Sequence, residues 1–360
     1  MFEYRSQWQQ RRAEMLAAIA QVLDSGTLIL GPRVREFERE FARYLGADDC
    51  AVGVASGTDA LALALRVLGV GAGDEVITTA NTAVPTVSAI RMVGATPVFC
   101  EIDRRSLLMN VCDAARRITS RTRALLPVHL FGNMVDMPAV MRLAGDRNLR
   151  VVEDCAQCTG ATLGGRHAGT FGDIGCFSFY PTKNLGAYGD GGLCLACSDE
   201  IADALRSARC FGARDYRVAT CEGVTSRLDE LQAAILLVKL RDLVADVAER
   251  RRLAQLYREQ LSDGVDLPTA LAECAHAYHL FVIAVDDRAK VIGRLEAEQI
   301  GYGIHYPVPI HLMPAYRFLG YSLPLTERAA ERILSLPCYP GLTDDEVARI
   351  CEVVNSAIAE

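Results

Sequence analysis

The sequence lacks the features that would place it in several special classes of protein. Its 360 residues carry a formal net charge of −7, so there is no basic surplus with which to bind nucleic acids in general. No run approaches the ~18 apolar residues of a membrane span, and the first residues contain no apolar core of a signal peptide. We therefore expect a cytoplasmic protein that binds neither membranes nor nucleic acids.

Low-complexity segments and short repeats are also missing. The composition, with 51% hydrophobic and 23% charged residues, is that of an ordinary globular protein. A chain of this length exceeds the ~250–300 residues to which a single core usually grows. We therefore expect two domains.

Cysteine, in contrast, is abundant. The chain has thirteen cysteines, and without an export signal we expect reduced thiols that act as small buried hydrophobes. Two Cys-x-x-Cys pairs, Cys155/Cys158 and Cys194/Cys197, invite a zinc interpretation. The gap between the pairs is much longer than the ~15–20 residues of a zinc ribbon, and we expect no metal site.

One lysine has unusual neighbours. The stretch 177–192 reads FSFYPTKNLGAYGDGG and places Lys183 among hydroxyls, aromatic rings and glycines. Glycines permit positive φ angles and the close approach of another group. The Lys183 amine is therefore a candidate Schiff-base nucleophile, although a solvated lysine beside a flexible turn is an equally open interpretation of this stretch alone.

Strand-like and helical stretches alternate through the first half of the chain. The strand-like stretches are 51–54, 75–78, 97–102, 123–128 and 149–152, and the helical ones between them include 59–68, 84–93 and 137–147. This alternation predicts an α/β fold with a mostly parallel sheet, whose ligands bind at the carboxyl ends of the strands. Helical stretches at 243–261 and 344–358 around a strand at 280–285 predict a smaller C-terminal domain.

Three features lie at the predicted strand ends. Ser56-Gly57-Thr58 joins a strand to a helix, so its backbone N–H groups form an anion site or, alternatively, Ser56 or Thr58 simply caps the helix. Asp154 follows the strand at 149–152, where it serves either a ligand or an ion pair within the domain. Together with Lys183, these are the phosphate site, pyridinium partner and amine that pyridoxal phosphate needs. A class I aldolase, which needs only the lysine, is a minor alternative.

These residues resemble the DegT/DnrJ/EryC1/StrS family of pyridoxal-phosphate sugar aminotransferases, of the aspartate-aminotransferase fold type I. The resemblance is carried by 24–26, 31–32, 55–61, 73–76, 153–157, 177–192, 227–234, 305–307 and 314–316. It implies a large cofactor-binding domain over residues 1–241, with a mostly parallel central sheet flanked by helices. A smaller C-terminal α/β domain over residues 242–360 would complete the fold.

The resemblance also implies individual roles. Lys183 would hold the cofactor covalently and move the proton, Asp154 would pair with the ring nitrogen, and Gln157 would touch the ring hydroxyl. The residues implied at the phosphate are Gly57, Thr58 and Ser178. Pyridoxamine phosphate would be the intermediate form of the cofactor.

Members of the family are homodimers whose active sites are shared between subunits. The residue borrowed from the neighbour is usually an asparagine two positions before the arginine of the motif at Arg227; here the position holds Thr225, with a shorter side chain. A second departure is Ala83, where some relatives place an aromatic ring over the cofactor.

Lys183 also favours transamination over sugar dehydration, because histidine replaces this lysine in the family's 3-dehydrases. The stretch 301–311 resembles members that aminate C3 of a 3-keto-6-deoxyhexose nucleotide, with glutamate as the expected donor. Amination at C4, dehydration and a non-catalytic cofactor-binding sensor remain alternatives. The candidate substrate contacts are Tyr180, Asn184, His305 and Tyr306. Arg209, Arg214 and Arg217 form either a basic patch for a diphosphate or a solvated face.

Overall fold

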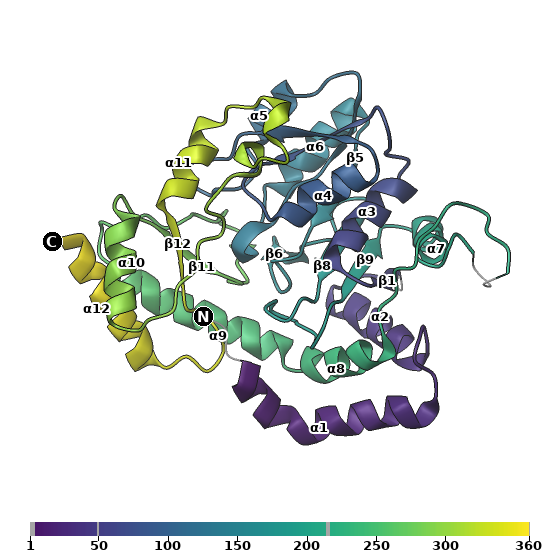
Figure 1. The fold of residues 1–360 in the computed structure, drawn as a ribbon, viewed down its shortest axis with the longest axis horizontal. Coiled ribbons are helices and arrows are strands. Elements are labelled where there is room, and N and C mark those ends of the chain that lie inside the picture. Colours follow the sequence, from purple (N-terminus) through teal and green to yellow (C-terminus); the bar gives the residue numbers. More distant parts are fainter. Residues whose placement is uncertain (1–3, 49, 214–216, 360) are drawn as a thin grey trace.

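The computed structural model describes residues 4–48, 50–213 and 217–359 (Figure 1). Its centre is a seven-stranded sheet in the order β1-β9-β8-β5-β4-β2-β3. The strands are β1 (Ala51–Val54), β2 (Glu75–Thr79), β3 (Thr96–Cys100), β4 (Thr122–Leu125), β5 (Arg150–Asp154), β8 (Ile174–Ser178) and β9 (Gly192–Ala196). Only β9 runs against its neighbours, β1 and β8, which confirms the predicted mostly parallel α/β sheet.

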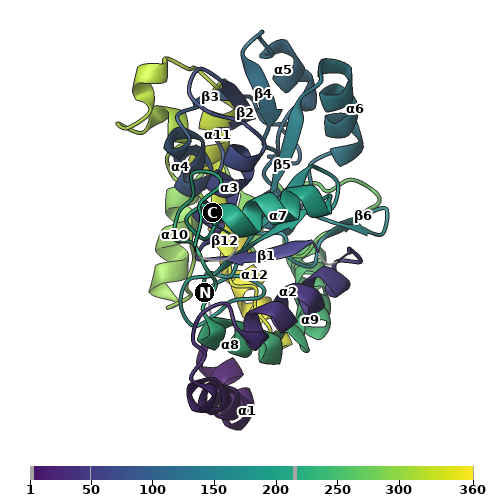
Figure 2. The same cartoon turned by 90° about the vertical axis from the view of Figure 1, so that its right-hand side faces the viewer.

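Helices cover both faces of this sheet, with α4 on one side and α6 on the other (Figure 2). The helices of this part are α2 (Pro32–Tyr44), α3 (Gly57–Val67), α4 (Val84–Met92), α5 (Val111–Arg116), α6 (Met137–Arg147), α7 (Asp199–Ala208) and α8 (Glu230–Leu240). All residues of β1, β2, β8 and β9 except Ser178 are buried, as expected for strands covered on both faces.

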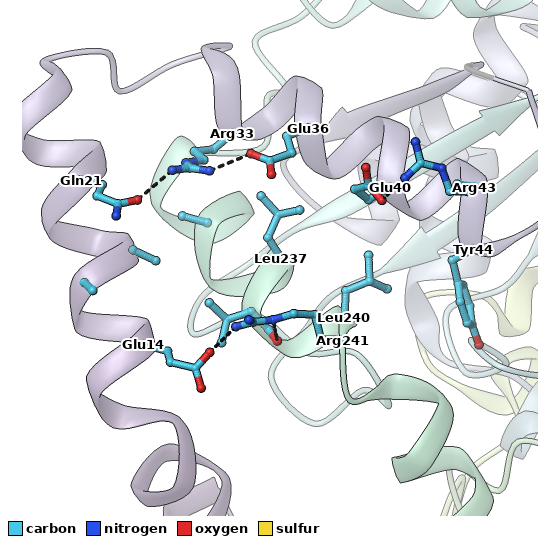
Figure 3. Close-up of a pocket in the computed structure, with 14 residues that line it drawn as sticks. Glu14, Gln21, Arg33, Glu36, Glu40, Arg43, Tyr44, Leu237, Leu240 and Arg241 are labelled. Atoms are coloured by element: carbon cyan, nitrogen blue, oxygen red, sulfur yellow. Dashed lines mark hydrogen bonds and ion pairs between the residues drawn. The ribbon is translucent and has the colours of Figure 1, made fainter.

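The long helix α1 (Tyr4–Ser25) lies outside this layered body, along α8 (Figure 1). Its Arg11 binds the carboxylate of Asp242, with 2.8 Å between Nε and Oδ2. Between α1, α2 and α8 lies a cavity of about 720 Å³ with a charged rim (Figure 3). None of the predicted site residues lines this cavity, so the cavity is not the predicted active site.

The last third of the chain builds a second hydrophobic core around Leu253, Tyr257, Phe281 and Val347. An antiparallel pair, β11 (Phe281–Ala284) and β12 (Ile333–Leu336), is accompanied there by α9 (Leu243–Gln260), α10 (Arg288–Ala297), α11 (Pro324–Arg332) and α12 (Asp344–Ala359). A separate core is what an independent domain needs. We propose that it forms the smaller domain expected from residue 242.

Short elements lie outside the central sheet and the β11–β12 pair. A small sheet joins β6 (Thr162–Leu163), β7 (Arg166–His167) and β10 (Cys274–Ala275). The 3₁₀ turns are η1 (Leu130–Gly132), η2 (Ile310–Leu312) and η3 (Arg317–Leu319). None of the described helices is long and apolar enough to cross a membrane.

Candidate active site

Asp154 is the last residue of β5, at the carboxyl edge of the parallel strands. Its Oδ2 accepts a hydrogen bond from Thr86 Oγ1 at 2.8 Å, and its Oδ1 accepts one from the Ala156 amide at 3.1 Å. Burial raises the pKa of Asp154, while these hydrogen bonds and the charge of Lys183 oppose the rise. The carboxylate is thus oriented by two donors and keeps lone pairs for a cationic partner.

Lys183 lies in the turn that follows β8 and is half-buried. Burial lowers its pKa to about 8, against the opposing charge of Asp154. An amine with this pKa is partly neutral near neutral pH, and the neutral form is the nucleophile and the base. The partial burial of Lys183 argues against a fully solvated lysine, and its role as a nucleophile stays a prediction.

The start of α3 is built against the end of β8. Ser56 caps the helix, because its Oγ accepts from the Asp59 amide at 3.1 Å. Within the described residues, the amides of Gly57 and Thr58 donate to no protein acceptor. A Cβ on Gly57 would lie only 2.6 Å from Ser178 Cβ. Capping and an open pair of amide donors therefore occur together, and an anion at these amides would lie beside Ser178.

Thr225, the expected cross-subunit contact, is exposed. The next residue, Ser226, holds this part of the chain in place. Ser226 Oγ donates to Asp59 Oδ2 at 2.8 Å and accepts from the Ala55 amide at 3.1 Å. These bonds tie the segment before α8 to the start of α3. Sequence reasoning missed Thr86, which orients Asp154, and Ser226, which holds the start of α3, because a lone hydroxyl carries no local signal.

Gln157 and Tyr306 meet although they are far apart in the sequence. Gln157 Oε1 accepts from the Phe131 amide at 2.8 Å, which fixes the orientation of the amide group, and its Nε2 donates to Tyr306 Oη at 3.0 Å. The second Nε2 proton remains for a ring hydroxyl. Burial and the charge of Asp154 raise the pKa of Tyr306 to about 12, so the phenol stays protonated.

The other predicted substrate contacts differ in their surroundings. His305 Nδ1 lies 2.9 Å from Ser335 Oγ, and burial together with the charge of Lys183 lowers the pKa of His305 to about 4. Tyr180 is 52% exposed. Asn184 is buried and donates through Nδ2 to Thr159 O at 3.2 Å and Ala277 O at 3.1 Å. Asn184 therefore joins two loops, and its contact with the substrate stays a prediction.

A buried cluster of polar side chains near the predicted site has a structural role. His129, Glu153 and Cys155 offer ligand atoms within 4.8 Å of one another. The Glu153 carboxylate is nevertheless fully engaged, since it pairs with His129 Nε2 at 3.0 Å and accepts from the amides of Gly169, Phe171 and Gly172. His129 Nδ1 accepts from the Val135 amide at 3.2 Å. This satisfied network favours a structural role over metal binding.

Arg209 fits neither interpretation of the arginine cluster. It is buried, and its Nη1 binds Glu38 Oε1 and Gly53 O, each at 2.6 Å. The expectation of a solvent-facing residue or a diphosphate contact is therefore wrong for Arg209, because an internal carboxylate takes its charge. Arg214 lies outside the described residues.

A family model, the DegT/DnrJ/EryC1/StrS aminotransferase family, matches residues 9–355. The chain belongs to this family. It is 46% identical to a dTDP-3-amino-3,4,6-trideoxy-alpha-D-glucose transaminase of Micromonospora megalomicea subsp. nigra, over 99% of this chain and 98% of the relative. It is 43% identical to a UDP-N-acetyl-3-dehydro-alpha-D-glucosamine 3-aminotransferase of Acidithiobacillus ferrooxidans, over 99% and 97%.

The fold also matches solved structures of the family. DesV of Streptomyces venezuelae, crystallised in complex with a ketimine intermediate, superposes with a TM-score of 0.97 at 41% identity, covering 99% of this chain and 98% of that one. The expected family, fold type and aminotransferase activity are thereby confirmed.

The cofactor of the chain is pyridoxal 5′-phosphate, and the side chains present fit it. The open amides at Gly57 and Thr58 suit its phosphate, Asp154 suits its ring nitrogen, and the amine of Lys183 suits its aldehyde. When bound, this cofactor supplies an electron sink for the carbon that exchanges its amino group.

Proposed function

We propose that the protein transfers an amino group from an amino acid, with glutamate as the expected donor, to C3 of a 3-keto sugar nucleotide. The observation that carries the transfer step is the placement of the half-buried Lys183 amine in the turn after β8, the strand that pairs with β5 and its terminal Asp154. Burial lowers the pKa of this amine to about 8. An amine in this state accepts and returns a proton near neutral pH. The site residues keep the roles proposed for them from the sequence.

The described contacts support a division of labour. Lys183 moves the proton, and Asp154 provides a fixed negative charge. Gln157 is held by the Phe131 amide, so that it presents its remaining donor in a set direction. Tyr306 accepts from Gln157, which leaves its own hydroxyl proton to donate toward a bound sugar. Neutral His305 can offer Nε2 as a donor or an acceptor, depending on its tautomer.

The choice of C3 is supported by the two relatives. Both act, by their names, at carbon 3, although one uses a dTDP-linked and the other a UDP-linked sugar. The two relatives share the carbon that is aminated but differ in the nucleotide, so we infer that the position of amination varies less between relatives than the nucleotide does. Amination at C4 is the alternative that an assay must exclude.

We further propose a homodimer with shared active sites. The segment after α7, which we call the arm (residues 210–213 and 217–225), extends away from the sheet (Figure 1). It exposes three large apolar side chains: Phe211 at 46%, Val218 at 66% and Val224 at 39%. Exposed apolar side chains on the segment that ends in the exposed Thr225 suit a subunit contact. A monomer in sedimentation equilibrium would exclude this part of the proposal.

Borohydride trapping and nitrogen transfer test the proposal together. The protein should form a trappable adduct on Lys183 and transfer nitrogen to a 3-keto sugar nucleotide, as read by product mass and NMR over a panel of 3-keto and 4-keto substrates. Lys183→Ala should abolish both, whereas Lys290→Ala in α10 should change neither.

Other outcomes select the alternatives. A product that loses water without gaining nitrogen would indicate a dehydrase. A protein that binds the cofactor but is inert with every amino donor would indicate a sensor. Normal transfer by Lys183→Ala would contradict the assignment of the lysine.

A further inference from the structure

A second lysine, Lys239 on α8, is more deeply buried than Lys183. The chain has only three lysines, Lys183, Lys239 and Lys290, and the structure places two of them around one small cavity of about 130 Å³. Lys239 is only 4% exposed. Its ammonium group donates to Gly186 O and lies 4.9 Å from the centre of the Tyr188 ring.

Burying this charge carries a cost that packing does not explain. Within the described residues no carboxylate forms an ion pair with Lys239, and burial lowers its pKa to about 8. Asp246, which borders the same cavity, opposes that shift only through its more distant charge. A buried ion without a paired counter-ion is destabilising, so an apolar residue at this position would stabilise the fold better.

The carbonyl that Lys239 holds belongs to the Lys183 turn. The Lys183 amide donates to Tyr180 O and the Ala187 amide donates to Phe179 O, both at 2.8 Å, so the segment 179–187 folds back on itself. Gly186 is packed so tightly that a Cβ there would lie 2.4 Å from Pro181 O. A displacement of Gly186 is therefore transmitted to the backbone that carries Lys183.

Helix α8 holds this turn at a second point. Gln232 Oε1 accepts from the Tyr188 amide at 3.0 Å, and its Nε2 donates to Tyr188 O at 3.4 Å. Gln232 and Lys239 lie two turns apart on the same face of α8. The helix thus provides two fixed anchors for the loop that follows Lys183.

We propose that Lys239 is a positioning residue, whose ammonium group fixes the Gly186 carbonyl and so sets the Lys183 amine toward the cofactor aldehyde. This inference rests on the proposed function, because it requires Lys183 to hold the cofactor. Lys239 itself touches neither cofactor nor substrate in this account.

The test compares Lys239→Met with the control Lys290→Met. Apoprotein is mixed with pyridoxal phosphate, trapped with borohydride at intervals, and analysed by peptide mass to locate the adduct. A hydrogen bond from a charged group contributes about 1.5–3 kcal/mol, so Lys239→Met should trap the cofactor on Lys183 about tenfold or more slowly. Lys290→Met should match the wild type.

Two further readouts separate positioning from general damage. Pyridoxamine phosphate cannot link to a lysine, so its Kd should stay within about twofold if only the Lys183 turn is disturbed. Hydrogen exchange should quicken in the peptide that covers 179–190 and not in α3. Loss of pyridoxamine phosphate binding equal to the loss of trapping would overturn the positioning role.

Failure of the inference is distinct from failure of the function. If the wild type forms no adduct on Lys183, the proposed function itself is wrong. If the wild type forms it and Lys239→Met does so at the same rate, Lys239 has no positioning role. Should Lys239→Met not fold, Gln232→Leu removes the other anchor and should slow trapping in the same way; an unchanged rate there contradicts the two-anchor account.

Discussion

Gly57→Ala tests the phosphate cradle by adding a single methyl group. Gly57 is the first residue of α3, and its φ is not positive, so the backbone itself accepts alanine. In a helix alanine is favoured over glycine by up to about 1 kcal/mol. The space, however, is taken: the new Cβ would lie 2.6 Å from Ser178 Cβ and 3.3 Å from Ser178 Cα.

The size of the effect follows from that contact. Ordinary contacts of a Cβ are 3.4–4 Å, so α3 and the end of β8 must separate by several tenths of an ångström or more. Overpacking of this kind costs about 1–3 kcal/mol. Because the displaced groups are the Gly57 amide and Ser178, we expect the cofactor Kd to rise about tenfold to a hundredfold. Overall stability should change less, since helix propensity offsets part of the strain.

The assay is a titration of apoprotein with pyridoxamine phosphate, which reports the cradle without the Lys183 linkage. Gly145→Ala in α6 is the matched control, because a Cβ there meets nothing within 4 Å. The control should bind the cofactor normally and be slightly more stable. A wild-type Kd for Gly57→Ala would refute the assignment of the cradle to the cofactor phosphate.

Two further predictions concern buried charges. Asp154→Ala should lower kcat about a hundredfold or more, while the Kd of pyridoxamine phosphate rises far less because the phosphate site survives, a split that steady-state kinetics and titration can measure; equal activity would remove the electron-sink argument. Arg209→Met leaves the Glu38 carboxylate buried without its cation, so the free energy of unfolding in urea should fall by about 3–5 kcal/mol, and Glu38→Gln in the same chain should restore part of it.

The sequence predicted the sheet well because its strands are short apolar runs between helices. The strand expected at 149–152 is β5, which continues to Asp154, so the carboxylate lies at the strand end where it was expected. The antiparallel direction of β9 was not foreseen. Its connection from β8 is the Lys183 loop without a helix, and only a connection without a crossover lets the chain return antiparallel beside its predecessor.

The residues that escaped prediction act over long separations in the sequence. Thr86 reaches Asp154 across 68 positions, and Ser226 reaches Asp59 across 167. A serine or threonine occurs in many surroundings, and nothing nearby distinguishes these two. Arg209 was misread for the same reason, since its partner Glu38 lies 171 positions away.

The motif at 227–234 was recognised only as a family resemblance, without a physical reason for its residues. The contacts of these residues supply that reason. Leu228 packs against Gly53 and Gly191, where an added Cβ would lie 3.1 Å from its side chain. Glu230 caps α2 by accepting from the Arg33 and Val34 amides, and Gln232 holds Tyr188.

One short segment thus joins β1, the start of α2 and the loop that carries Lys183. Glu230 and Gln232 make two of these contacts from α8, and Leu228 makes the third from just before the helix, so the segment supports the loop that carries Lys183. A substitution of an α8 side chain that contacts the Lys183 loop should therefore change the rate at which the cofactor is trapped on Lys183, even though none of these side chains takes part in the reaction.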